Sequence, residues 1–165
     1  MQHVIPLEKE AKRYQQKLCK MHPDLEPLVK KELNKMLDTK IIFPVRHRCW
    51  VANLVPVRNK NGDIRLCIDF RNLNKASQKD NYPVPSMEHI LQCIYGSEML
   101  SQLDGFSGYN QVLVSHGDQF KTTFNTKWGT YAYHKMHFGL INAGATFQRA
   151  MGIAFRGFIN RSVVV

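Results

Sequence analysis

The strongest structural signal in the chain is a β-hairpin. Residues 50–57 and 64–70 are rich in apolar and β-branched side chains, and Asn61-Gly62 separates them. An Asn-Gly pair between two such runs favours a tight turn, because both residues tolerate a positive φ. Pro56 has no amide hydrogen, so we expect it at an edge or at the end of the first strand. The hairpin around residues 51–70 therefore provides one antiparallel pair of the sheet.

The other segments mix helical and strand-like patterns without a regular β-α repeat. Apolar residues at helical spacing predict an amphipathic helix over 27–40, and Ser86 and Asn142 are placed to cap two further helices. Extended segments are expected at 8–20 (or loosely helical there), 80–85, 99–104, 111–114, 121–124 and 130–134, with a turn at Trp128-Gly129. This order predicts an α+β fold, a mainly antiparallel sheet with packed helices.

Length and composition bound the class of protein. The 165 residues, 44% of them hydrophobic, are enough for one globular domain with a real core. The formal net charge of +10 favours a polyanionic partner such as nucleic acid, the alternative being a charge that only keeps the protein soluble. The four cysteines form no C-x-x-C pair, so we expect reduced, mostly buried thiols. No leader or membrane span is evident, which predicts an intracellular protein, in a cytoplasmic particle or the nucleus, that is not secreted and has no membrane partner.

Asp104 is the first candidate for chemistry. It ends an apolar run, is followed by small flexible residues, and shares residues 101–165 with six Lys and Arg but only one other acid, Asp118. An isolated carboxylate in a basic field suggests a cation-mediated grip on an anion. Gly105 lets the backbone bend so that its carbonyl can turn toward the same cation, which makes half of a Mg²⁺ site. A simple turn-forming aspartate is the alternative.

Three other features allow a functional or a structural interpretation. Arg65 projects from the hairpin near Arg58 and Lys60, where the cluster either meets phosphates or forms a solvated tip. Tyr109 either stacks on a base or sugar or belongs to the core. The residues before the helix at Asn142 either face phosphate through the helix N-terminus or only cap it. His134 and His137 have no third partner for a metal site.

An ordered set of motifs resembles the reverse transcriptase of gypsy-type retrotransposons. The matching segments are L-C-I-D-F-R-N-L-N-K at 66–75, Y-P-V-P at 82–85, L-D at 103–104 with S-G-Y at 107–109, and F-G-L-I-N-A at 138–143 with A-T-F-Q at 145–148. The resemblance implies the fingers and partial palm of a right-hand polymerase: an approach segment over 1–22, fingers over 23–98 and a partial palm over 99–165.

The resemblance also assigns roles to residues. It implies that Asp104 is the first catalytic, metal-binding aspartate, assisted by the Gly105 carbonyl, and that Arg65 binds the triphosphate of the incoming nucleotide. The remaining nucleotide-binding positions are the main-chain amides at Ser107 and Gly108, the ribose-selecting ring of Tyr109, and Phe138 and Gly139 beside the pocket. Two Mg²⁺ ions, an RNA template, a DNA primer or RNA/DNA hybrid, deoxynucleoside triphosphates and the rest of the Pol polyprotein are the implied cofactors and partners.

The sequence departs from the family pattern at three places. It ends before the Tyr-x-Asp-Asp hairpin that supplies the other two catalytic carboxylates, and His137 and Gly144 stand where family members usually or often have proline. We therefore expect a fragment of a reverse transcriptase that performs two-metal nucleotidyl transfer in the intact protein and is inactive as this chain. The alternatives are a non-catalytic nucleic-acid-binding remnant and a decayed reading frame whose product folds poorly.

Overall fold

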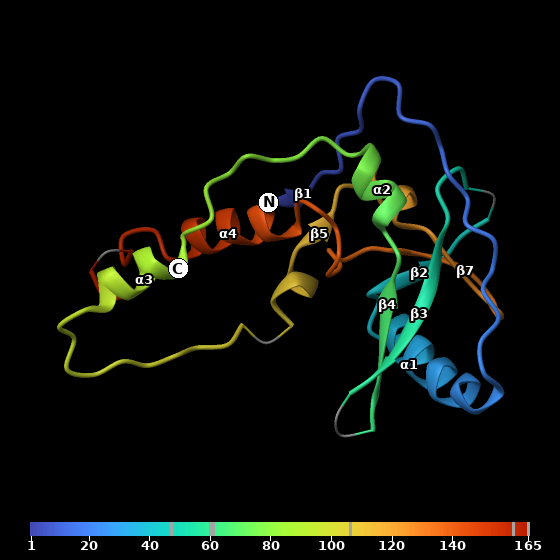
Figure 1. Cartoon of the computed structure of the whole chain (residues 1–165), viewed down its shortest axis with the longest axis horizontal. Helices are drawn as coiled ribbons and strands as arrows, with labels where there is room; N and C mark the ends of the chain where they lie inside the picture. The colour runs from blue at the N-terminus through green and yellow to red at the C-terminus, as the bar shows by residue number, and fades with distance from the viewer. Residues whose placement is uncertain (47, 60–61, 106, 160, 165) are drawn as a thin grey trace.

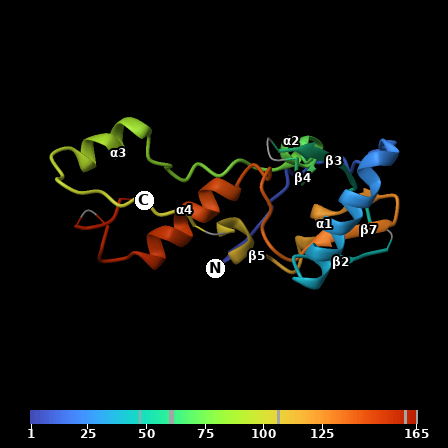
Figure 2. The ribbon, with the colours of Figure 1, turned by 90° about the horizontal axis from the view of Figure 1, so that it is seen from below.

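A computed structural model describes residues 1–165 with the exception of 47, 60, 61, 106, 160 and 165. The five-stranded sheet and helix α1 lie at one end of the molecule, and helices α3 and α4 extend toward the opposite end (Figure 1). The second view, turned by 90°, keeps the same separation (Figure 2).

The sheet joins segments from both halves of the chain. Its strand order is β2-β7-β6-β3-β4, with antiparallel pairs β2–β7, β6–β7 and β3–β4 and one parallel pair, β3–β6. The bounds are β2 Ile42–Pro44, β3 Ala52–Arg58, β4 Ile64–Ile68, β6 Phe124–Thr126 and β7 Gly129–Tyr133. A separate two-stranded parallel pair joins β1 (Gln2–His3) to β5 (Leu113–Val114). The predicted α+β class with a mainly antiparallel sheet is confirmed.

The β3–β4 hairpin is confirmed, and its register runs from Leu54 opposite Ile68 to Arg58 opposite Ile64. Asn61 of the expected turn lies outside the described residues, whereas Gly62 has the positive φ of 84° that the turn signal predicts. Only Ala52 and Asn53 of β3 pair with β6, and Pro56 lies beyond them. The β6 side of Pro56 therefore has no paired strand in the described part of the sheet, so its lack of an amide hydrogen leaves no ladder bond unmade there.

The predicted amphipathic helix is α1 (Glu26–Asp38), which packs against β4 and β2. Val29 and Leu33 are almost completely buried, whereas Leu28 lies toward solvent, so the apolar stripe is narrower than the sequence indicates. Before α1, the chain makes the short 3-10 helix η1 (Pro23–Leu25). The segment 8–20 makes a turn at residues 9–10 and contains no helix, and the amide of Gln16 donates to the Val51 carbonyl at 2.8 Å. Of the two alternatives, extended or loosely helical, the extended one agrees with the structure after this turn.

The strand predicted over 99–104 is wrong. These residues form no strand, and Met99 and Leu103 expose 90% and 86% of their surface. A strand is stable only when a neighbour pairs its backbone and covers its apolar face, and no described segment does so here. Asp104 therefore lies in an exposed loop instead of at a strand end.

The segment 111–124 contains less strand than its sequence suggests. The 3-10 helices η2 (Gly108–Gln111) and η3 (Gln119–Thr122) occupy parts of the stretches predicted at 111–114 and 121–124. The hydroxyl of Thr122 donates to the Gln119 carbonyl at 2.6 Å and accepts the amide of Tyr133 at 2.9 Å, which stabilises this helical turn. The turn before β7 and the strand over 130–134 are confirmed by the hairpin β6–β7.

Two helices flank the connector at 80–85. After helix α2 (Arg71–Ala76), the connector runs without regular structure to α3 (Met87–Ile94), whose first turn is capped by the Ser86 hydroxyl accepting the His89 amide at 3.2 Å. None of the α3 residues is buried. The capping prediction is confirmed, and α3 presents apolar side chains to solvent.

Asn142 does not cap helix α4 (Ala143–Ala154) with its side chain, although it occupies the capping position. Its amide group instead binds the connector: Oδ1 accepts the Asp80 amide at 2.9 Å and Nδ2 donates to the Gln78 carbonyl at 2.8 Å. Ala143, Ala145 and Thr146 form the buried face of α4. The apolar side chains further along the chain are less covered: Phe147 is half-buried, and Phe158, beyond the helix, exposes 59% of its surface.

The four cysteines, Cys19, Cys49, Cys67 and Cys93, are free and exposed, so the expectation of buried thiols is wrong. Hairpin geometry explains the exposure of Cys67, which alternates with the inward-facing Leu66 and Ile68 on β4.

Among the described residues, no helix combines the length and apolarity that a bilayer crossing requires.

Candidate active site

The loop that carries Asp104 ends in a tight turn. The Gly108 amide donates to the Gly105 carbonyl at 2.9 Å, and Ser107 has a left-handed backbone with φ of 48°. A non-glycine residue in this region is uncommon and marks a turn that its surroundings hold in place. Asp104 and Ser107 are exposed. The Gly105 carbonyl expected to assist a cation thus already accepts one hydrogen bond, and the Gly108 amide is already engaged.

The ring of Phe147, on α4, supports this turn from below. A Cβ added to Gly108 would lie 2.8 Å from two of its ring atoms, and one added to Gly105 would lie 3.6 Å from its tip. Only a residue without a side chain fits at 108 while the ring stays where it is. The glycine is thus explained by close packing, because its φ is not positive.

Tyr109 is half-buried and lies between two phenylalanine rings. Its ring centroid is 5.2 Å from that of Phe147 and 6.1 Å from that of Phe138, the latter in an edge-to-face arrangement. These distances are typical of favourable aromatic pairs. Phe138 is 72% exposed, so the cluster is open to solvent on that side. Tyr109 therefore packs against the core while part of its side chain remains accessible from the surface.

A second turn, over 138–141, brings Phe138 to this cluster. Gly139 has φ of 98°, and its backbone lies against the end of β4, with the Ile68 carbonyl 3.9 Å from an added Cβ. Asn74 of α2 holds the turn from both sides: Nδ2 donates to the Gly139 carbonyl at 2.7 Å, and Oδ1 accepts the Ile141 amide at 3.0 Å. Two segments about 30 residues apart in sequence thus meet beside Tyr109.

His137 precedes this turn and points into the core. Burial lowers the pKa of His137 to about 4, so the imidazole is neutral at pH 7. Its ring lies 4.4 Å from that of Tyr133, and burial raises the pKa of Tyr133. Both side chains pack between the sheet and the 138–141 turn. The position therefore carries a neutral ring packed against Tyr133.

Arg65 lies apart from this cluster. It is exposed on β4 opposite Val57, on the hairpin face that also carries Val55 and Cys67. No ion pair engages Arg65 among the described residues, and its strand partner is Val57. The structure thus groups Gly105, Gly108, Tyr109, Phe138 and Gly139, and it leaves Arg65 on a free surface of the hairpin.

The electrostatics of the region fit a solvent-facing carboxylate. Asp104 makes no ion pair with any described residue, whereas Asp69 is paired with Arg71 at 2.8 Å and Asp80 is paired with Arg149. The Arg71 guanidinium lowers the pKa of Asp69, and the Arg149 guanidinium lowers the pKa of Asp80. No group of three metal-ligating side chains occurs in the described part of the chain.

Two residues of the site were not recognised from the sequence as part of it. Phe147 and Asn74 each belong to a motif of the family resemblance, but neither was given a role. Asn74 lies in α2, a helix of only six residues. A polar side chain on so short a helix is a signal for a hydrogen bond to another part of the fold. Nothing in the local pattern distinguishes Phe147 from its apolar neighbours.

Comparison with known proteins agrees with this geometry. The family described as "Reverse transcriptase (RNA-dependent DNA polymerase)" matches residues 57–165. The chain is 34% identical over 142 residues to the retrovirus-related Pol polyprotein from transposon 297 of Drosophila melanogaster, covering 86% of this chain and 13% of the polyprotein. It is 37% identical over 102 residues to an RNA-directed DNA polymerase homolog of Oenothera berteroana, covering 62% of this chain and 72% of that protein.

Solved structures share the fold at lower identity. The prototype foamy virus protease-reverse transcriptase CSH mutant matches with a TM-score of 0.86 at 20% identity, over 98% of this chain and 22% of that one. A foamy viral protease-reverse transcriptase in complex with RNA/DNA hybrid matches with a TM-score of 0.80 at 16% identity, over 99% of this chain and 22% of that one. Sequence and fold agree, and this chain belongs to the reverse transcriptase (RNA-dependent DNA polymerase) family.

Proposed function

We propose that this chain forms the fingers (23–98) and the first part of the palm (99–165) of an RNA-directed DNA polymerase within a retrotransposon Pol polyprotein, with 1–22 as an approach segment. The observation that carries the proposal is the meeting of the 105–109 and 138–141 turns around Tyr109 and Phe147. These turns contain the motifs that resemble the family's nucleotide site. The chain spans 13% of the transposon 297 polyprotein, so the activity of the whole protein is part of the proposal.

In this proposal the cluster binds a deoxynucleoside triphosphate. The Tyr109 ring, held between Phe138 and Phe147, would lie against the sugar and exclude a ribose 2′-hydroxyl by its position. Phe138 and Gly139 would border the base, and Ser107 and Gly108 would approach the triphosphate with their backbone. Arg65, free of any ion pair among the described residues, would bind phosphate oxygens.

The chain's residues fit one side of a Mg²⁺ site. The exposed, unpaired Asp104 carboxylate is a hard oxygen ligand of the kind Mg²⁺ takes, and the Gly105 carbonyl retains a second lone pair beside its hydrogen bond. Two Mg²⁺ ions, when bound, would neutralise charge on the phosphates in the attack of a primer 3′-hydroxyl on the α-phosphorus. One carboxylate is too few to hold two ions, so we propose that nucleotidyl transfer needs carboxylates beyond those of this chain.

The proposed partners are an RNA template, a DNA primer or RNA/DNA hybrid, and the rest of the polyprotein. Solved reverse transcriptases of the same fold were determined with double-stranded DNA and with RNA/DNA hybrid, which supports this class of partner. The net charge of +10 is consistent with binding to a phosphate backbone. We place the protein inside the cell, in a cytoplasmic particle or the nucleus, where such templates occur.

Primer extension on an RNA template with Mg²⁺ tests the function. We would compare the 165-residue chain with a longer chain that continues into a Tyr-x-Asp-Asp hairpin, each with Asp104 or with Asp104→Asn. The proposal expects extension only by the longer chain, and a loss of at least about 10²-fold in rate with Asp104→Asn. Activity of the short chain, or full activity of the Asp104→Asn variant, would contradict the assignment.

A further inference from the structure

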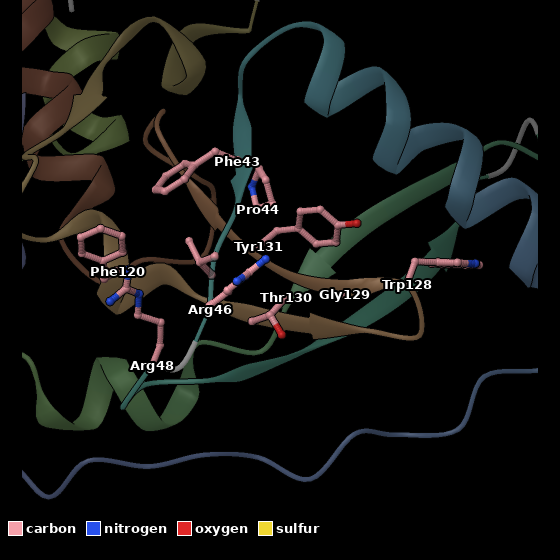
Figure 3. Close-up of a pocket in the computed structure, with 10 residues that line it drawn as sticks. Phe43, Pro44, Arg46, Arg48, Phe120, Trp128, Gly129, Thr130 and Tyr131 are labelled. Atoms are coloured by element: carbon pink, nitrogen blue, oxygen red, sulfur yellow. The ribbon is translucent and has the colours of Figure 1, made fainter.

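A second candidate binding surface lies at the other edge of the sheet from β4. A hollow of about 530 Å³ opens along β2, the irregular residues Val45, Arg46 and Arg48 after it, η3 and the β6–β7 turn (Figure 3). None of the residues proposed for the polymerase site lines it. Its volume is within the ~300–1,000 Å³ range of ligand sites.

Aromatic rings and arginines line this hollow together. Figure 3 shows Phe120 at one end and Trp128 at the other, with Tyr131 between them. All three rings are half-buried, so part of each ring is open to solvent. Their positions are fixed by packing: Phe120 lies 6.0 Å edge-to-face from Phe43, and Tyr131 lies 5.9 Å from the fully buried Phe124. Rings held in this way lose little entropy when a planar ligand stacks on them.

Two arginines in the hollow have no counter-ion among the described residues. The guanidinium carbon of Arg48 lies 3.6 Å from the centre of the Phe120 ring, and its Nε is buried without a hydrogen-bond partner among the described residues. Arg46 is exposed, and its side chain points into the hollow beside Tyr131 (Figure 3). A guanidinium group is charged at neutral pH and, without a carboxylate partner, favours an anionic ligand.

No described acid competes for these arginines. No Asp or Glu lines the hollow, and Glu26 is paired with Lys127, the residue before Trp128, at 2.7 Å. The described carboxylates that form ion pairs do so with other cations. The electrostatic field over the hollow is therefore positive.

We propose that this hollow binds single-stranded nucleic acid, with bases stacked on Trp128 and Tyr131 and phosphates held by Arg46 and Arg48. Open ring faces next to uncompensated guanidinium groups match a chain of planar bases joined by phosphates. A duplex buries its base faces in its own stack, so it offers the rings nothing to bind. An acidic protein segment would satisfy the arginines but leave the tryptophan and tyrosine faces unused, which is why we favour nucleic acid.

Fluorescence anisotropy with labelled oligonucleotides tests the proposal. The full 165-residue chain would be titrated into oligouridine RNA and oligothymidine DNA of about 12 nucleotides, within the ~4–16 nucleotides that one such module covers. EDTA and the absence of nucleoside triphosphates keep the proposed polymerase site from contributing metal-dependent binding. If RNA binds more tightly than DNA, the site contacts the 2′-hydroxyl; if the two bind equally, it recognises base and phosphate only. A duplex of equal length should bind at least about tenfold more weakly than either single strand.

Matched variants separate this site from general charge. Arg46→Ala/Arg48→Ala should weaken binding at least about tenfold and reduce the salt slope by about 1.4, that is about 0.7 for each single-strand phosphate contact. The control Arg156→Ala/Arg161→Ala removes the same charge from exposed positions elsewhere and should leave most of the affinity. Trp128→Ala should weaken binding about tenfold through lost stacking, whereas Tyr95→Ala, at a ring 92% exposed, and Asp104→Asn should not.

Thermal unfolding shows whether each variant is folded. If a variant is not folded, crosslinking to the unchanged chain tests the binding site instead. Oligomers carrying 4-thiouridine, irradiated with the unchanged chain, should crosslink to peptides containing Phe120 or residues 128–131. Crosslinks confined to other peptides, equal losses in the two double-arginine variants, or equally effective competition by poly-glutamate would overturn the proposal. The last outcome would identify a surface for acidic proteins. None of these assays requires polymerisation, so they test the proposed binding site in the hollow independently of the proposed polymerase function.

Discussion

The ring of Phe147 fills the space that a side chain at Gly108 would need, and a Cβ built there would lie 2.8 Å from two ring atoms. This contact joins helix α4 to the loop that carries Asp104, and the same ring packs 5.2 Å from Tyr109. The position of the loop over the candidate site therefore depends on one glycine and one aromatic ring.

The first prediction concerns this contact. Gly108→Ala should lower the free energy of unfolding by about 1–3 kcal/mol, because the ring is held by Tyr109 and must move. Urea denaturation followed by circular dichroism measures the change. Gly144→Ala is the control, since a Cβ at that position in α4 meets nothing within 4 Å and alanine favours the helix by about 1 kcal/mol. Phe147→Leu in the Gly108→Ala background should recover part of the loss, and no recovery would mean that the clash is not its cause.

Asn74 should position the turn beside Tyr109. Asn74→Asp keeps the oxygen that accepts the Ile141 amide but removes the donor to the Gly139 carbonyl and places a charge next to it. We expect faster amide exchange over 138–141, by about tenfold, from the loss of about 1–1.5 kcal/mol of local stability. Hydrogen exchange followed by mass spectrometry measures it. Asn72→Asp, at a side chain of the same helix without a hydrogen bond to the described residues, should leave that exchange unchanged.

Two buried histidines predict the pH dependence of stability. Burial lowers the pKa of His3 and of His137 to about 4, from an ordinary value of 6.5. The unfolded chain therefore binds more protons than the folded chain between about pH 6.5 and pH 4, so stability is full above pH 6.5 and falls as the pH drops through that window. Each histidine contributes up to about 3 kcal/mol at the acid end.

Urea midpoints at pH 7, 5.5 and 4.5 test this dependence. His137→Leu should be less sensitive to acid than the parent chain. The matched control is His116→Gln at an exposed imidazole, which should follow the parent curve. His3 faces Asp118 and Asp80, which raise its pKa against the effect of burial, and it is hydrogen-bonded to Thr146 at 2.8 Å. An acid dependence that is the same in the parent and His137→Leu would show that other groups cause it.

Asn142 should hold the connector at 78–80 onto α4. Asn142→Ala removes the acceptor of the Asp80 amide and the donor to the Gln78 carbonyl, at a residue only 5% exposed. Stability should fall by about 1–3 kcal/mol, and trypsin should cut after the exposed Lys79 more rapidly than in the parent chain. Gln148→Ala, at a side chain of the same helix without a hydrogen bond to the described residues, is the control. Unchanged cleavage at Lys79 would argue against this tether.

Some of the fold followed from local patterns. The hairpin around residues 51–70 depends on a turn signal and two adjacent apolar runs, and the cap at Ser86 depends on the three residues after it. Family membership followed from motifs that are continuous in sequence, and the residue match over 57–165 confirms it. The roles assigned to Arg65, Asp104 and Tyr109 remain predictions.

Other features were decided by contacts between distant parts of the chain. The stretch 99–104 has the composition of a strand but no described partner, and Asn142 has the position of a cap but binds a connector more than 60 residues earlier. His3 and Thr146 are 143 residues apart in sequence and share a buried hydrogen bond. Elements whose stabilising contacts are local, and the family, could be predicted from the amino-acid sequence. The partners of polar side chains could not, because buried hydrogen-bonding groups are satisfied by whichever groups the folded chain brings within reach.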